Sequence, residues 1–69
     1  MMYWIKERHN PQTGVYYVMM GQMTAKEARG YEKHRSYGTN YMHKFRSHAE
    51  YSAEAERLSQ AGERVQGRI

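Results

Sequence analysis

YWIKERHNPQTGVYYVMM, residues 3–20, predicts a β-hairpin at the start of the fold. Both ends of this stretch are rich in aromatic and β-branched residues, which suit a pleated surface. Between them lies the segment NPQTG, residues 10–14. Its proline presets φ early in the turn, and Gly14 can supply the positive φ that closes it. We therefore expect two antiparallel strands joined by a tight turn.

Two helix starts follow the hairpin, and each has the pattern of a capping box. Residues 24–27 (TAKE) and 47–50 (SHAE) place a glutamate three positions after a hydroxyl that can accept a hydrogen bond from an orphan amide. The helices are expected over about residues 25–36 and 48–61. Each should end near a glycine, because glycine adopts a left-handed cap at little cost. These glycines are Gly38 and Gly62.

The segment between the helices predicts a third strand. Residues 40–45, NYMHKF, are short and alternate, with the odd-numbered side chains on one face. The order β-β-α-β-α gives an α+β domain over residues 1–62, with a three-stranded antiparallel sheet and two helices packed on one face. Residues 63–69 have glycines nearby and little periodicity, so we expect a flexible C-terminal tail.

The predicted core is small and rich in aromatic residues. Leucine, isoleucine, valine and phenylalanine number seven, whereas there are nine aromatic residues and six methionines. On the second helix, Tyr51, Ala55 and Leu58 recur at i, i+4 and i+7, which predicts its buried face. One core is expected, containing Trp4 or Ile5, Val15 or Val18, Phe45, Tyr51 and Leu58. Seven such side chains are few for a stable monomer. We therefore expect a weak homodimer, or a monomer that binds a protein partner.

The composition excludes several kinds of site. The chain has no cysteine for a disulfide or a thiolate zinc site, and no aspartate for a calcium or magnesium loop. No two of its four histidines have the i, i+4 spacing of metal ligands on a helix, and no phosphate loop is present. The longest apolar stretch, residues 15–20, is far shorter than the roughly 20 residues of a membrane span. We expect a cytoplasmic protein without metal, cofactor or membrane contact.

Catalysis is not expected either. No glycine-bracketed serine forms a nucleophile elbow, and no aspartate can orient a histidine. Glu50 and Glu54 are one helical turn apart, as a carboxylate pair would be. However, Arg57 follows Glu54 by three residues, a spacing that favours an ordinary ion pair on the helix surface.

Basic residues are grouped rather than scattered, in a chain with 11 lysines and arginines against seven acids. Lys26, Arg29 and Lys33 have the spacing of a stripe along the first helix, and Lys44 and Arg46 close the third strand. Clustered cations interleaved with tyrosines are typical of phosphate-binding surfaces, because cations release counterions from the phosphates and rings can stack on bases. The alternative is a solvated or protein-binding face.

Another basic pair, Lys6 and Arg8, leads into the hairpin turn. The residues expected to bind nucleic acid or another partner lie on the first helix and the third strand: Lys26, Arg29, Lys33, Tyr41, His43, Lys44 and Arg46. The tyrosines and methionines of residues 16–23 have two interpretations. They are either the core of a leucine-poor domain or part of a protein-binding face.

The chain resembles the small amino-terminal hybrid-binding domain of ribonuclease HI, which also runs hairpin, helix, strand, helix. The similar stretches are residues 3–5, 14–16, 38–45 and 47–58, so the resemblance spans roughly residues 3–58. It implies binding to an RNA–DNA hybrid without cleavage. In the third strand only Lys44 matches the family's lysines.

In size and style the chain also resembles the accessory proteins of bacteriophages and prophages. That resemblance implies a different function, in which a surface of tyrosine, methionine and arginine binds and inhibits a host or defence protein. The basic net charge of +4 argues against one subtype, the acidic mimic of DNA. Nucleic acid is slightly favoured as the partner, because the cations are clustered.

Overall fold

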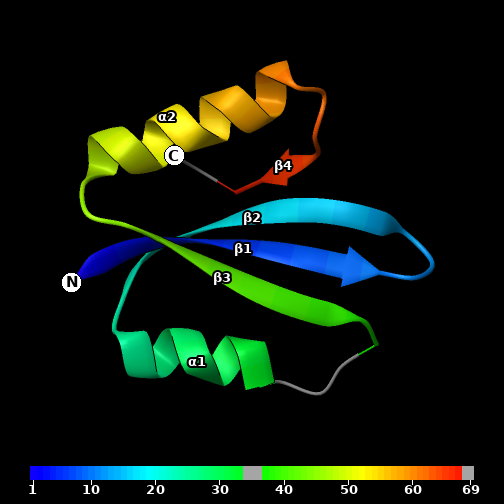
Figure 1. Ribbon diagram of the computed structural model, residues 1–69, viewed down its shortest axis with the longest axis horizontal. Coiled ribbons are helices and arrows are strands. Elements are labelled where there is room, and N and C mark those ends of the chain that lie inside the picture. Colours follow the sequence, from blue (N-terminus) through cyan, green and yellow to red (C-terminus); the bar gives the residue numbers. More distant parts are fainter. Residues whose placement is uncertain (34–36, 68–69) are drawn as a thin grey trace.

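The computed structural model describes residues 1–33 and 37–67, which form two helices and a four-stranded sheet (Figure 1). The elements are β1 (Met2–Asn10), β2 (Gly14–Met23), α1 (Ala25–Lys33), β3 (Thr39–Phe45), α2 (His48–Gln60) and β4 (Val65–Gln66). The strand order is β3-β1-β2-β4. β1 is antiparallel to both β2 and β3, whereas β4 is parallel to β2. The predicted α+β class is confirmed, but the sheet is mixed and has a fourth strand.

The hairpin turn forms as the sequence predicts. The Asn10 side-chain oxygen accepts hydrogen bonds from the amides of Gln12 (2.8 Å) and Thr13 (3.2 Å), so the asparagine side chain organises the turn. Gly14 has φ of 88°, in the left-handed region that glycine adopts without strain. β2 also contains a bulge, because the register with β1 shifts between Trp4 and Ile5.

The first helix start has the full predicted capping box, whereas the second has the predicted serine cap but its Glu50 carboxylate accepts from the Arg46 amide. The Glu27 amide donates to the Thr24 hydroxyl oxygen, and the Thr24 amide donates back to the Glu27 carboxylate, each at 3.2 Å. Ser47 Oγ accepts from the Glu50 amide at 3.2 Å. The second helix ends at Gln60, close to its predicted end. The predicted end of the first helix, at residue 36, lies outside the described residues.

The helices pack on opposite faces of the sheet, so the prediction that both lie on one face is wrong. Ile5 belongs to a cluster with Tyr51 of α2, whereas Trp4 belongs to a cluster with Ala28 of α1. Adjacent strand residues point to opposite faces, so these are two cores separated by the sheet. Figure 1 shows the two helices on either side of the strands. The cores are thin because each is covered by one short helix.

Burial on α2 follows the predicted stripe, since Tyr51, Ala55 and Leu58 are all buried. The hairpin valines differ from the prediction. Val15 is 39% exposed and Val18 is only half-buried, because methionines of β2, rather than valines, reach the two cores.

The segment after α2 is not simply a flexible tail. Val65 and Gln66 form β4 beside Tyr17 and Val18, and the Tyr17 amide donates to the Arg64 carbonyl oxygen at 2.8 Å. Val65 also packs against the core under α2. A strand of two residues is too short to show a hydrophobic period, which is why the sequence did not predict it.

Candidate functional site

The two faces of the sheet carry opposite charges. Trp4, Lys6 and Arg8 occupy every second position of β1, so their side chains lie on the same face of the sheet. This is the face that α1 covers. Lys44 of β3 pairs with Trp4 of β1, so its side chain is on the same face. Glu7 lies on the opposite face, which α2 covers. Among the charged residues of the described strands, all the lysines and arginines thus lie on the α1 side and the single acid on the α2 side.

The helices repeat this separation of charge. α1 carries three cations and two glutamates, whereas α2 carries one arginine and three glutamates. Both glutamates of α1 are engaged locally. Glu27 caps the helix, and Glu32 accepts a hydrogen bond from the Met42 amide at 3.2 Å on the outer edge of β3. The α1 side is therefore the basic side of the molecule.

Aromatic and polar contacts hold the cations of the sheet in place. The Lys6 ammonium lies 5.6 Å from the centre of the Tyr31 ring. Arg8 donates to the Asn40 side-chain oxygen at 2.8 Å and to the Tyr37 carbonyl oxygen. Towards β4, the Arg64 guanidinium lies 5.1 Å from the centre of the Tyr16 ring. Because Tyr16 pairs with Arg8, its side chain is on the same face of the sheet.

We call these seven residues the basic face: Lys6, Arg8, Lys26, Arg29, Lys33, Lys44 and Arg64. Four of them are in the predicted binding set. On α1, Lys26 and Lys33 lie on the opposite side of the helix from the buried Ala28, and Arg29 is also exposed.

Two of the other predicted residues, His43 and Tyr41, are not brought into this face, and Arg46 follows the end of β3. His43 alternates with Lys44 and lies on the α2 side. Tyr41 is there too, because its ring packs edge-on against His9, which lies on the Glu7 face (5.2 Å between ring centres). The Arg46 amide donates to Glu50 of α2 at 3.3 Å. The prediction grouped neighbours in sequence, whereas a strand sends consecutive side chains to opposite faces.

Three members of the basic face are missing from the predicted set. Lys6 and Arg8 form a basic pair in the sequence, and their even spacing from Trp4 is the signal that places them with Lys44. Arg64 lies in the segment that was expected to be flexible. Nothing in the sequence indicates that its side chain reaches Tyr16.

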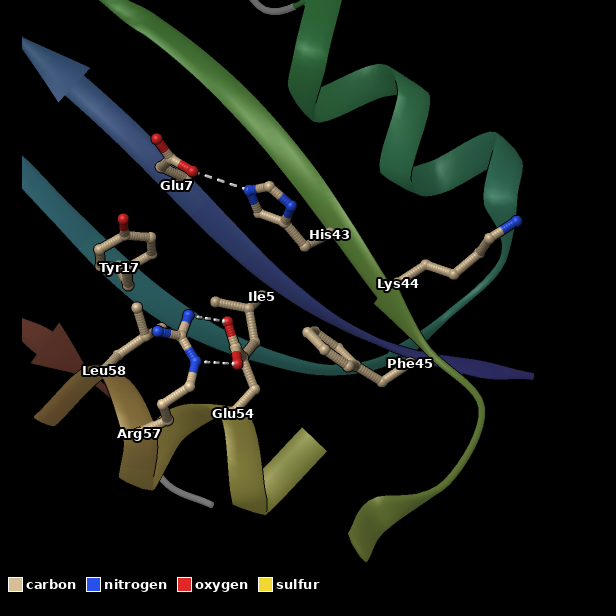
Figure 2. Close-up of a pocket in the computed structure, with 9 residues that line it drawn as sticks. All are labelled: Ile5, Glu7, Tyr17, His43, Lys44, Phe45, Glu54, Arg57 and Leu58. Atoms are coloured by element: carbon tan, nitrogen blue, oxygen red, sulfur yellow. Dashed lines mark hydrogen bonds and ion pairs between the residues drawn. The ribbon is translucent and has the colours of Figure 1, made fainter. Parts of the chain in front are cut away.

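The α2 side of the sheet contains a pocket of about 400 Å³ between α2 and β3 (Figure 2). Its apolar lining comes from Ile5, Phe45 and Leu58, and its polar lining from Glu7, Tyr17, His43, Glu54 and Arg57. Lys44 also borders it, but Figure 2 shows its side chain extending away from the other lining residues. The pocket and the basic face are thus on opposite sides of one sheet.

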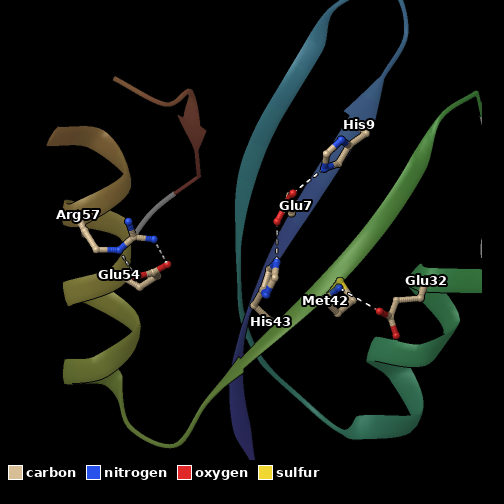
Figure 3. Close-up of polar contacts among 7 residues, drawn as sticks. All are labelled: Glu7, His9, Glu32, Met42, His43, Glu54 and Arg57. Atoms are coloured by element: carbon tan, nitrogen blue, oxygen red, sulfur yellow. Dashed lines mark hydrogen bonds and ion pairs between the residues drawn. The ribbon is translucent and has the colours of Figure 1, made fainter. Parts of the chain in front are cut away.

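Two polar clusters line this pocket (Figure 3). In the first, Glu7 accepts hydrogen bonds from the Nε2 atoms of His9 (2.5 Å) and His43 (2.8 Å). In the second, Arg57 forms a bidentate pair with Glu54, with Nε–Oε1 and Nη2–Oε2 distances of 2.7 and 2.6 Å. The ion pair predicted from their spacing is confirmed.

These contacts change how the pocket residues titrate. The hydrogen bond from His9 is the largest influence on Glu7 and lowers its pKa, although partial burial opposes it and His43 adds to the lowering. The hydrogen bond from Arg57 likewise lowers the pKa of Glu54. Burial, followed by the charge of Glu7, raises the pKa of Tyr17. At neutral pH both glutamates are therefore ionised and the tyrosine is neutral.

The lowered pKa of Glu7 predicts a loss of stability in acid. A carboxyl whose pKa is lower in the folded state stabilises the fold above its unfolded pKa of about 4.3, and this contribution disappears as the pH falls through the folded value. Glu7→Gln should therefore weaken the fall in unfolding free energy between about pH 5 and pH 3. Urea unfolding at stepped pH values measures this. Glu56→Gln, an exposed change on α2, should keep the wild-type profile, and equal profiles for all three proteins would contradict the prediction.

Within residues 1–33 and 37–67, no three histidine, cysteine, aspartate or glutamate side chains are arranged to hold a metal ion. In the same part of the chain, neither helix has the length and apolar character needed to cross a membrane. No family model, no curated protein and no solved structure matches the chain.

Proposed function

We propose that this protein is a non-catalytic module that binds the phosphate backbone of nucleic acid with its basic face. The observation that carries the proposal is the separation of charge across the sheet. Lys6, Arg8 and Lys44 lie on one face, and Glu7 lies on the other. A net charge of +4 spread evenly would favour no particular surface, whereas cations gathered on one side create a directed field.

The geometry of the basic face suits a polyanion. Lys44 and Lys6 are on adjacent strands, which lie roughly 4.8 Å apart, and Arg64 extends the row beyond β2. Cations held against tyrosine rings lose less side-chain freedom when they bind phosphate. The half-buried Tyr16 adds a ring beside Arg64 on which a base or sugar can stack.

The test is the salt dependence of binding to a labelled duplex, measured by fluorescence anisotropy. Lys6→Gln/Lys44→Gln should weaken binding and reduce the slope of log K against log salt by about 1.8, because two phosphate contacts with the duplex are lost. Arg57→Gln removes a cation from the α2 side and should leave the slope unchanged. Equal slopes for all three proteins would contradict the proposal. RNA–DNA hybrid, DNA duplex and single strands, compared in the same assay, test the hybrid preference that the family resemblance implies.

The accessory-protein alternative predicts another outcome. Nucleic acid would bind with no dependence on Lys6 or Lys44, and a single protein partner would remain bound after nuclease treatment of a bacterial lysate. The methionines give this alternative little support, because Met19 and Met23 are buried in the two cores. Of the exposed tyrosines, Tyr31 borders the basic face, whereas Tyr41 lies on the α2 side, so these two rings do not form one surface.

A further inference from the structure

The pocket on the α2 side has the construction of a small-molecule site and is separate from the basic face. Its volume of about 400 Å³ lies within the range of about 300–1,000 Å³ that is usual for ligand pockets. Ile5 is only 1% exposed and Leu58 5%, so part of the apolar lining is rigid core. Phe45 is half-buried and contributes an aromatic ring. The lining combines these three apolar side chains with a larger number of convergent polar groups, so it favours a ligand with both an apolar body and a polar end.

The charge in this pocket is negative. Glu7 and Glu54 contribute two carboxylates, and Arg57 contributes one guanidinium. The bidentate contact neutralises Glu54 and Arg57 against each other, which leaves the charge of Glu7. His9 and His43 donate hydrogen bonds to Glu7 from their Nε2 atoms. Lys44, the other charged residue at the border, directs its side chain away from the pocket (Figure 2).

Several groups remain able to bind a ligand. The Tyr17 hydroxyl and the His43 Nδ1 atom take no part in the hydrogen bonds found among the described residues. When His43 donates from Nε2 to Glu7, the neutral ring has an accepting lone pair on Nδ1. The rings of Tyr17 and Phe45 can attract a cation through their π-electrons. The polar lining therefore offers acceptors and a negative charge beside an apolar wall.

We propose that this pocket binds a small organic cation, an ammonium group carried on an aromatic or apolar body. The apolar body lies against Ile5, Phe45 and Leu58. The ammonium group donates hydrogen bonds to Glu7 and His43. A carboxylate ligand of the same shape is repelled by Glu7 and lacks the protons that these acceptors need.

A nuclear magnetic resonance titration with three probes of similar shape tests this proposal: 2-phenylethylammonium, 3-phenylpropanoate and 2-phenylethanol. The ammonium ion should shift the methyl signals of Ile5 and Leu58 and the ring signals of Phe45, with a dissociation constant on the order of 1–10 mM. The carboxylate should shift them least, and the alcohol should be intermediate. The Ala28 methyl group, on the other face of the sheet, is the internal control.

Two variants with opposite expected effects sharpen the test. Glu7→Gln removes the excess charge and should weaken ammonium binding about two- to fivefold. Arg57→Gln leaves Glu54 without its cation and should strengthen ammonium binding by a similar factor. Glu56→Gln removes one negative charge, as Glu7→Gln does, but Glu56 lies on α2 outside the pocket. This variant should change the affinity little.

Three results would each overturn the proposal. They are equal affinities for the ammonium and the carboxylate, an absence of shifts at Ile5 and Leu58, and an unchanged affinity in Arg57→Gln. The last result is decisive even if Glu7→Gln unfolds, because Arg57 is exposed and its replacement leaves the apolar core intact. None of these outcomes depends on nucleic-acid binding, since the pocket and the basic face lie on opposite sides of the sheet.

Discussion

Tyr51→Ala should reduce the free energy of unfolding by about 3–5 kcal/mol. Tyr51 is 2% exposed and is one of the two largest fully buried side chains, and it packs against Ile5, Met19 and Tyr3 between α2 and the sheet. A domain of this length has a total stability of roughly 3–10 kcal/mol, so the variant should lose a large share of it and unfold at a much lower urea concentration. Far-ultraviolet circular dichroism with urea unfolding measures the effect.

Tyr51→Phe is the matched control for this change. It keeps the ring but removes the hydroxyl oxygen that accepts a hydrogen bond from the Gly21 amide at 2.9 Å. The cost should be about 1–3 kcal/mol, because the amide loses its partner. The phenylalanine variant should therefore still fold, but it should unfold at a lower urea concentration than the wild type. A near-wild-type unfolding midpoint for Tyr51→Ala would show that α2 does not pack on the sheet as described.

Gly38→Ala should cost about 2–6 kcal/mol, the other large effect. Gly38 has φ of 110°, in the left-handed region that L-residues rarely adopt. A Cβ atom there would also collide with the carbonyl oxygen of His9, just where β3 begins to pair with β1. The added methyl group must push the two strands apart or change the path of the chain into β3.

Gly14→Ala separates these two causes. Gly14 also has a positive φ, of 88°, but a Cβ atom there would meet nothing within 4 Å. Its replacement should cost only the backbone strain of about 1–3 kcal/mol. Thermal unfolding of both variants gives the comparison. If Gly38→Ala is no more destabilising than Gly14→Ala, residue 38 does not approach β1 as closely as the structure shows.

Most of the local structure was predictable from the sequence, because short-range chemistry decides it. Asn10 and Gly14 define the turn, Thr24 and Ser47 begin the helices, and the buried stripe on α2 follows the helical period. Each of these features depends on residues within one or two turns of chain. Burial of Tyr51, Ala55 and Leu58 together confirms that such a stripe is reliable even when it is narrow.

The arrangement of these elements was not predictable to the same degree. Trp4 and Ile5 are both buried, and an apolar pair at adjacent strand positions indicates a strand covered on both faces. This pair therefore indicates two cores rather than the single one expected. β4 depends on contacts with Tyr17, Val18 and the core under α2, which are far from it in the sequence, so local patterns do not reveal it.

For the candidate site, the sequence indicates which kinds of residue take part better than it indicates which surface of the molecule they lie on. The cations of α1 and Lys44 were predicted and belong to the basic face, whereas His43 and Tyr41 are on the other side of the sheet. Strand alternation decides this, because it sends Lys44 to the α1 side and both His43 and Tyr41 to the α2 side. The pocket combines residues from β1, β2, β3 and α2, so no single stretch of sequence contains its pattern.

The central claim, that the basic face is the nucleic-acid surface, is tested most directly by the arginine side-chain signals of the wild-type protein. Arg8 and Arg64 lie on the basic face, whereas Arg57 lies on the α2 side. When a short nucleic-acid duplex is titrated, nuclear magnetic resonance should show the Nε–H signals of Arg8 and Arg64 shifting, with the shifts reversed by added salt. The Arg57 signal should stay in place. Shifts at Arg57 with none at Arg8 and Arg64 would contradict the claim.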